Sequence, residues 1–296
     1  VLNAQPAPEQ SSEEATPGMQ EMRAVSAAGQ NAGRGRAVAV SARTGQGIAE
    51  LKERLAALAA APQNEKKLAS DLLPPGGLAV LVVPVDKAAP KGRLILPQQQ
   101  TIRDLLDAGD CAVVCRESEL EKTLARLGGD PDLVITDSQV FPLVDRLTPA
   151  RVPLTSFSIL FARYKGDLEQ AAAGAQALKT IRDGDRILIS EGCTHHRQCG
   201  DIGTVKLPAW IREYTKASPE FTFTSGTEFP EDVSGYRLIV HCGGCMLNGR
   251  EMKSRLRTAA DQGVPMTNYG ILIAFMKGIL ERSMRALTPR DQGERA

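Results

Sequence analysis

The sequence predicts an α/β fold with two small parallel sheets that follow one another along the chain. From residue 78 onwards, short β-branched and aliphatic runs alternate with segments of helical periodicity. Strands that alternate with helices pair in parallel. The length of 296 residues favours more than one domain. A stretch at 59–77 that contains Pro62, Pro74 and Pro75 breaks the periodicity and indicates a linker.

Before the linker, the sequence predicts one strand-turn-helix unit. Residues 3–36 contain hardly any large apolar side chain, so they cannot offset the entropy of ordering, and we expect a mobile arm. Residues 36–40 form a predicted short strand, which a turn at 45–47 follows. Apolar residues then recur at helical spacing, at Ile48, Leu51, Leu55 and Leu58.

After the linker, the predicted elements fall into two blocks. The first block has strands at 78–85, 111–115 and 133–136 and helices at 98–108 and 117–127. The second block has strands at 155–161, 186–190, 221–224, 237–241 and 265–268 and helices at 168–181, 248–262 and 271–287. Each block therefore predicts its own parallel sheet.

The composition argues against several classes of protein. The formal net charge of +1 creates no overall field that would attract nucleic acid or a membrane surface. Apolar stretches such as 271–275 fall far short of the roughly 18 residues that span a bilayer. Six cysteines lack the dense spacing of a secreted disulfide scaffold. We therefore predict a cytoplasmic protein whose thiols remain available for metal.

Two groups of cysteine and histidine residues form the candidate metal site. They are Cys193 and His195 after the strand at 186–190, and His241, Cys242 and Cys245 at the end of the strand at 237–241. Both groups leave the carboxyl ends of parallel strands, where ligands bind in open α/β sheets. The glycines at 243 and 244 suit a tight turn whose amides approach the sulfur atoms.

The spacing of these residues leaves the identity of the metal open. Zinc would use a closed set of four ligands, for instance Cys193, His195, Cys242 and Cys245. Three thiolates with a weaker fourth ligand suit a 4Fe-4S cluster instead. All three histidines of the chain lie within three residues of a cysteine, which argues against unrelated buried thiols.

The same residues resemble the signature of a known family, the (FeFe)-hydrogenase maturation GTPase HydF. That family carries Cys-x-His, a long spacer and then His-Cys-x-x-Cys, and the segments 191–199, 201–208 and 265–270 are also similar to it. The resemblance runs from about residue 37 to the C-terminus. It implies a 4Fe-4S cluster on Cys193, Cys242 and Cys245, with a fourth ligand drawn from His195, His241 and Asp201.

The resemblance also implies a domain organisation. Residues 1–61 would be the truncated end of a P-loop-type GTPase domain, 62–77 a linker, 78–153 a dimerisation domain and 154–296 the cluster-binding domain. Ser41 and Ala42 are similar to the guanine-loop motif of such GTPases. The sequence contains no Gly-x-x-x-x-Gly-Lys-Ser/Thr, so we expect no GTP hydrolysis, and GTP binding only if a further domain is present.

The role implied by the resemblance is that of a scaffold and not of a catalyst. A homodimer would carry the di-iron precursor of the hydrogenase cofactor and deliver it to the (FeFe)-hydrogenase apoprotein, in concert with the radical-SAM maturases. The alternative is a zinc-stabilised interaction module without an assembly role. We expect no chemistry of Cys111 and Cys115, which are predicted to be buried core thiols on one strand face, and no ligand role for Cys199.

Overall fold

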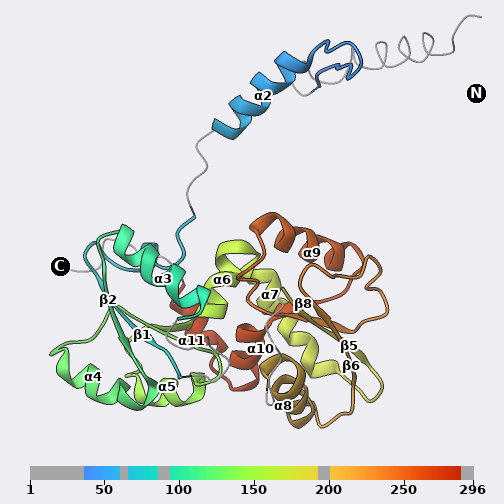
Figure 1. Cartoon of the computed structure of the whole chain (residues 1–296). Coiled ribbons are helices and arrows are strands. Elements are labelled where there is room, and N and C mark those ends of the chain that lie inside the picture. The colour runs from blue at the N-terminus through green and yellow to red at the C-terminus, as the bar shows by residue number, and fades with distance from the viewer. Residues whose placement is uncertain (1–36, 61–65, 86–93, 193–200, 288–296) are drawn as a thin grey trace, which may run out of the picture. The chain divides into compact units, whose positions relative to one another are not determined.

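The computed structural model describes residues 37–60, 66–85, 94–192 and 201–287, with only the backbone given for 58–60. The chain divides into two compact units, residues 1–65 and 66–296. Figure 1 labels most of the elements. Within the described residues, no helix combines the length and the apolar character that crossing a membrane requires.

The described part of the first unit is a turn followed by the helix α2 (Ile48–Ala60). The helix confirms the predicted spacing of apolar residues, although Leu55 is 56% exposed. The predicted strand at 36–40 is wrong over residues 37–40, which lie outside any strand. A strand needs a neighbour for its backbone hydrogen bonds, and the described residues of this unit contain no second strand.

The first sheet of the second unit is parallel and has the order β2-β1-β3-β4. Its strands are β1 (Leu78–Val82), β2 (Cys111–Cys115), β3 (Leu133–Thr136) and β4 (Leu154–Ser156). The helices α3 (Leu96–Asp107), α4 (Leu120–Arg126) and α5 (Phe141–Leu147) connect them. Strands β1, β3 and β4 are almost wholly buried, as expected for parallel strands with helices on both faces.

The strand predicted at 155–161 is wrong beyond residue 156. Its first residues complete the first sheet as β4, and the helix α6 (Phe157–Lys165) begins directly afterwards. The Ser156 side chain accepts a hydrogen bond from the Ile159 amide and caps this helix. A cap in the middle of a β-branched and aromatic run converts the second half of the run to helix.

The second sheet is also parallel, with the order β6-β5-β7-β8. Its strands are β5 (Arg186–Glu191), β6 (Glu220–Ser225), β7 (Leu238–His241) and β8 (Met266–Asn268). Its helices are α7 (Leu168–Ala175), α8 (Leu207–Thr215), α9 (Gly249–Asp261) and α10 (Tyr269–Met276), and the last helix, α11 (Leu280–Arg285), packs against β4 of the first sheet. The prediction of two parallel α/β sheets is therefore confirmed.

The helix predicted at 271–287 is interrupted. Helix α10 ends before Gly278, which has a φ of 74°, and α11 begins after it. Glycine adopts this left-handed conformation at little steric cost and commonly terminates helices. The prediction was wrong because the apolar spacing continues through the break.

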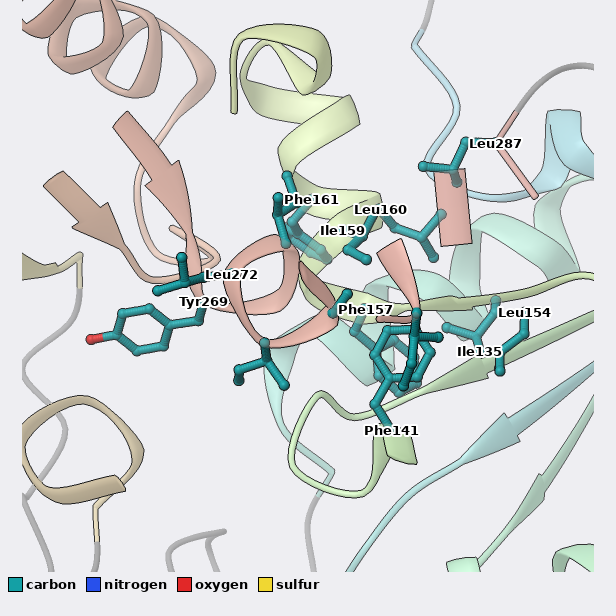
Figure 2. Close-up of a cluster of buried hydrophobic side chains, with 14 of the residues drawn as sticks. Ile135, Phe141, Leu154, Phe157, Ile159, Leu160, Phe161, Tyr269, Leu272 and Leu287 are labelled. Carbon is teal, nitrogen blue, oxygen red and sulfur yellow. The ribbon is translucent and has the colours of Figure 1, made fainter. Parts of the chain in front are cut away.

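One hydrophobic cluster joins the two sheets of the second unit, and a smaller cluster lies between the second sheet and α9. One cluster of buried residues contains Val80 of β1 together with Ile187 of β5. Helix α6 lies between them, and Figure 2 shows its residues Phe157 and Leu160 in this core together with Phe141 and Leu272. Both sheets therefore pack against the same helix, which contacts β4 of the first sheet and β8 of the second.

Candidate metal centre

The candidate site lies where strand β7 ends, beside strand β5. These strands are neighbours, with Ser190 opposite His241, and the Cys242 amide donates a 2.9 Å hydrogen bond to the Ser190 carbonyl. Strand β6 lies on one side of β5, and strand β7, which follows β6 in the chain, lies on the other side. The strand order therefore changes direction between β5 and β7. Loops at such a switch point diverge and leave room for a ligand. The segments that follow β5 and β7 therefore start side by side.

The sulfur of Cys242 accepts hydrogen bonds from two backbone amides. The Gly192 amide lies 3.0 Å from Cys242 Sγ, and the Gly244 amide lies 3.3 Å from it. Hydrogen bonds of this kind favour the thiolate over the thiol. Gly244 has a φ of 60°, and a β-carbon at this position would come within 2.7 Å of the Met252 sulfur. This turn therefore requires glycine, and its amide stabilises the thiolate form that binds metal.

Lys165 fixes the backbone of the cysteine turn. Its Nζ atom, at the end of α6, donates hydrogen bonds of 2.8–3.0 Å to the carbonyls of Gly244, Cys245 and Leu247. Burial lowers the pKa of Lys165, and the charges of Cys245 and Cys242 oppose this shift. The ammonium group therefore brings positive charge near the two thiols and holds the three carbonyls in place.

Helix α9 begins immediately after the turn. The Asn248 side chain accepts a 2.9 Å hydrogen bond from the Glu251 amide and caps the helix. The amino end of a helix carries a partial positive charge that favours nearby anions. Together with Lys165, this end makes the surroundings of the turn favourable for thiolates.

His241 is fully buried and both of its ring nitrogens have partners. Nδ1 lies 2.8 Å from the Cys242 carbonyl oxygen, and Nε2 lies 3.0 Å from Nη1 of Arg255. A carbonyl only accepts, so Nδ1 carries the proton and Nε2 accepts from Arg255. Burial, together with the charge of Arg255, lowers the pKa of His241 to about 4. His241 is thus a neutral imidazole that holds the Cys242 carbonyl.

Arg255 connects four segments around this histidine. Its side chain, only 2% exposed, bonds to Glu251 on its own helix, to Ser190 of β5 and to the Gly226 carbonyl. The guanidinium also lies 5.1 Å from the ring centre of Phe229. Arg255 therefore fixes the ends of β5 and β7 relative to α9.

Asp201 and Tyr269 lie near the same end of the sheet. Asp201 Oδ2 accepts hydrogen bonds from the Gly203 and Thr204 amides and from the Thr204 hydroxyl, and so caps the π-helical turn Ile202–Lys206. The Tyr269 hydroxyl donates to Glu191 at 3.3 Å. Burial raises the pKa of Tyr269, and the charges of Glu191, Cys242 and Asp201 add to this shift. The tyrosine therefore lies among the acidic groups of the site.

The structure places only part of the predicted ligand set. Cys193 and His195 lie outside the described residues, as does Cys199, for which no ligand role is expected, whereas His241, Cys242, Cys245 and Asp201 lie within them. Within the described ranges, no three cysteine, histidine or acidic side chains converge as a metal site. The donor chemistry of the turn nevertheless fits a thiolate-bound metal, because two amides donate to the Cys242 sulfur and the Lys165 ammonium group binds the carbonyls of the same turn.

Ser41 and Ala42 lie in a tight turn ahead of α2. The Ser41 amide donates to the Gln46 carbonyl, and the Gly45 amide donates to the Ser41 carbonyl. Gly47 has a φ of 74°, and a β-carbon there would come within 2.2 Å of a backbone carbonyl oxygen. The turn is therefore well defined, while its similarity to a guanine loop stays a prediction.

The expected burial of both cysteines of β2 is wrong for Cys111. Cys111 is exposed and Cys115 is partly buried. The reason is the sheet order, because β2 is an edge strand and its first residue lacks a neighbour on one side. No disulfide joins the cysteines of the described residues.

Lys165 and Arg255 were not anticipated from the sequence as parts of the site. Lys165 lies far from the turn in sequence, and no local motif marks it. Arg255 carries a signal that could have been used. It lies on the apolar stripe of α9 between Met252, Leu256 and Ala259, where a charged residue must find partners within the protein.

Replacing Lys165 with Met is expected to weaken metal retention by about 10–100-fold, the usual effect of losing a group that orients ligands. The three carbonyls that it holds would lose their common donor. The measurement is the rate at which a chelator removes metal from the reconstituted chain. Lys253→Met, on the exposed face of α9, is the matched control. Equal rates for both variants would contradict this role.

Comparison with known proteins identifies the family. The family model for the hydrogen maturase F dimerization domain matches residues 68–166, and the model for the hydrogen maturase F tetramerization domain matches residues 169–286. No curated protein matches the chain. The two matches together extend over both sheets.

Two solved structures of other proteins align with the chain at low similarity. One is a putative LacI-family transcription repressor from Corynebacterium glutamicum, with 14% identity and a TM-score of 0.24, covering 71% of this chain and 89% of its own. The other is an ABC transporter solute-binding protein from Burkholderia multivorans, with 11% identity and a TM-score of 0.22, covering 72% and 89%. Such low scores carry no argument about function. On the two family matches, the chain belongs to the hydrogen maturase F (HydF) family.

Proposed function

We propose that this chain is a scaffold for hydrogenase maturation that binds a 4Fe-4S cluster through Cys193, Cys242 and Cys245. It would carry the di-iron precursor of the hydrogenase cofactor and deliver it to the apoprotein. The observation that carries the proposal is the Cys242 sulfur, which accepts two backbone amides at the switch point of the second sheet. The family assignment supports the role in maturation.

The candidates for the fourth ligand differ in their surroundings. His241 would have to release Arg255 before Nε2 could bind iron. Asp201 uses Oδ2 for all three hydrogen bonds of its cap, so Oδ1 is the oxygen that would be offered to metal. His195 is the third candidate and lies outside the described residues. Of the two described candidates we propose Asp201, because its binding does not require the Arg255 network to break, and His195 stays a candidate from the sequence.

The bound cluster would supply an iron with an exchangeable coordination position for the precursor. The residues of the chain prepare the site for it. Lys165 and the amino end of α9 place positive charge at the turn, and the His241–Arg255 pair holds the Cys242 carbonyl. Turnover of GTP is not part of this proposal, because the sequence has no P-loop.

The domains matched in the chain also support self-association, and we propose a homodimer formed through the first sheet. That sheet has two edges, β2 and β4. β4 is fully buried and packs against α6 and α11, whereas β2 is partly exposed along its length. An exposed edge strand is a ready template for pairing with another chain. The radical-SAM maturases and the hydrogenase apoprotein are the proposed partners, in the cytoplasm.

The test compares two metal-loaded forms of the chain. One portion is reconstituted anaerobically with iron and sulfide, and a second portion is loaded with zinc. Each is incubated with a synthetic di-iron complex, freed of excess complex and mixed with apo-hydrogenase. Hydrogen production is expected only with the iron-sulfur form. Equal activation by the zinc form would overturn the proposal in favour of a zinc-stabilised interaction module.

A further inference from the structure

The two halves of the second unit are repeats of one another. The segment 153–162 reads Pro-Leu-Thr-Ser-Phe-Ser-Ile-Leu-Phe-Ala, and the segment 265–274 reads Pro-Met-Thr-Asn-Tyr-Gly-Ile-Leu-Ile-Ala. Each segment forms the last strand of its sheet and the helix that follows, β4 with α6 and β8 with α10. Both sheets have the same strand order, in which the second and third strands lie on either side of the first. The unit therefore contains one α/β fold twice.

The strand registers show which residues of the two halves are equivalent. Thr136 of β3 pairs with Ser156, and His241 of β7 pairs with Asn268. Ser156 and Asn268 occupy the same place in the repeat, because each caps the helix that follows it. Thr136 is thus equivalent to His241, and the loop at 137–139 is the equivalent of the cysteine turn.

Equivalent contacts relate the two halves by an approximate two-fold axis. Helix α6 packs against α10 between the two sheets (Figure 1). The Gly270 amide donates a 3.2 Å hydrogen bond to Ser158 Oγ, and these two residues occupy the same place in the repeat. A β-carbon on Gly270 would lie 3.1 Å from Ser138 Oγ, and one on Gly243 would lie 3.7 Å from Ser158 Oγ. Each loop thus packs against the first turn of the other half's helix, so the loop of the first half and the cysteine turn both lie next to the axis.

Lys206 brings positive charge to the loop of the first half. Its Nζ atom donates a 2.7 Å hydrogen bond to Gln139 Oε1. The carboxylate of the same loop, Asp137, accepts from the Gln139 amide instead. Lys206 is half-buried, and among the described residues no carboxylate forms an ion pair with it. Because burying a charge costs free energy unless an opposite charge offsets it, this ammonium group points to an anionic ligand.

The π-helical turn that carries Lys206 begins at the metal site. Gly203 of this turn has no room for a β-carbon, because the side chains of Glu191 and Tyr269 lie against it. Burial raises the pKa of Tyr269, and the nearby charges of Glu191 and Cys242 add to this shift. The turn therefore extends from the surroundings of Cys242 to the loop of the first half.

We propose that Lys206 and the loop at 137–139 form a second wall of the metal site, across the approximate two-fold axis from the cysteine turn, and that this wall binds the di-iron precursor as an anion. This inference rests on the proposed function. Ligands of open α/β sheets bind outside the carboxyl ends of the strands at a switch point, and here two such points adjoin.

The two residues of this wall have different roles. A complex attached to an iron of the cluster extends beyond the cysteine turn, so the loop across the axis is within its reach. Lys206 donates to the terminal ligand atoms of the complex with the hydrogens that Gln139 leaves unused. Gln139 is a positioning residue, because it holds the ammonium group in place.

The test is the affinity of the cluster-loaded chain for a synthetic di-iron carbonyl complex that carries two cyanide ligands and is a dianion. The infrared bands of its carbonyl and cyanide groups measure the bound complex. Lys206→Met is expected to raise the dissociation constant about tenfold or more, the effect of losing a hydrogen bond between charged groups. Lys253→Met, on the exposed face of α9, should leave it unchanged. Equal constants for the two variants would overturn the role of Lys206.

A double-mutant cycle tests the role of Gln139. Gln139→Leu should raise the dissociation constant by less than Lys206→Met does. The double variant Lys206→Met/Gln139→Leu should bind no more weakly than Lys206→Met alone, because Gln139 acts through the lysine. Lys206→Arg keeps the charge and should retain most of the affinity. Additive losses in the cycle would contradict the positioning role, and a loss in Lys206→Arg equal to that in Lys206→Met would contradict recognition by charge.

Iron and sulfide assays separate failure of this inference from failure of the proposed function. All of these variants should hold as much iron and sulfide as the natural sequence. A lower content in Lys206→Met would place the lysine at the cluster and contradict its assignment to the di-iron complex. If the natural sequence forms no cluster or binds no complex, the proposed function and this inference fail together. If it binds the complex and Lys206→Met binds it equally well, only this inference fails.

Discussion

Replacing Cys242 with Ser is expected to abolish cluster binding. The Cys242 sulfur is the atom to which the Gly192 and Gly244 amides point, and a serine hydroxyl at neutral pH does not ionise to replace a thiolate ligand. The iron content after anaerobic reconstitution should fall to a small fraction of that of the natural sequence. The fold should persist, because serine is similar in size and the backbone bonds of the turn remain.

The matched control for this prediction is Cys115→Ser. Cys115 is a partly buried cysteine of the first sheet that belongs to no candidate metal site. Circular dichroism shows whether both variants fold, and iron and sulfide assays measure the cluster. Full iron content in Cys242→Ser, with normal content in the control, would exclude Cys242 as a ligand.

Replacing Arg255 with Met is expected to lower the free energy of unfolding by about 1–3 kcal/mol or more, the cost of leaving buried acceptors without a donor. The substitution keeps much of the volume but removes the donor that Arg255 supplies to His241 Nε2 and to the Gly226 carbonyl, whereas the Ser190 hydroxyl still accepts from Thr224. Urea denaturation of the metal-free chain at neutral pH measures the loss.

Arg257→Met is the control for the arginine prediction. Arg257 lies on the same helix α9 but is exposed, and removing a surface charge changes stability by about 0.5 kcal/mol or less. Similar midpoints for the two variants would contradict the claim that Arg255 organises the carboxyl end of the second sheet.

The sheets could be predicted from the sequence because their strands are short runs of β-branched and aliphatic residues between helical segments. The predicted limits of 111–115 and 133–136 coincide with β2 and β3. The helices α5 and α8 were missed because each has proline in its first turn, at Pro142 and Pro208. When helices are predicted from periodicity, proline indicates the end of a helix, although proline is favoured in the first turn of a helix.

The candidate site was predictable only where it is local in sequence. The His-Cys-Gly-Gly-Cys turn and its place after a strand follow from spacing, and the structure has β7 end at His241. The contacts of Lys165 and Arg255 depend on how α6 and α9 pack against the sheet. Periodicity assigns helices to a surface but does not determine which side chain of one helix reaches a particular loop.

The most direct test of the proposed function is metal and acid-labile sulfide analysis of the anaerobically reconstituted chain, with a visible spectrum. The account predicts about four irons and four sulfides per chain and the broad absorption of a thiolate-bound cluster. One zinc and no sulfide after the same treatment would contradict it. The site would then be structural, and the role of carrier for the di-iron precursor would have to be withdrawn.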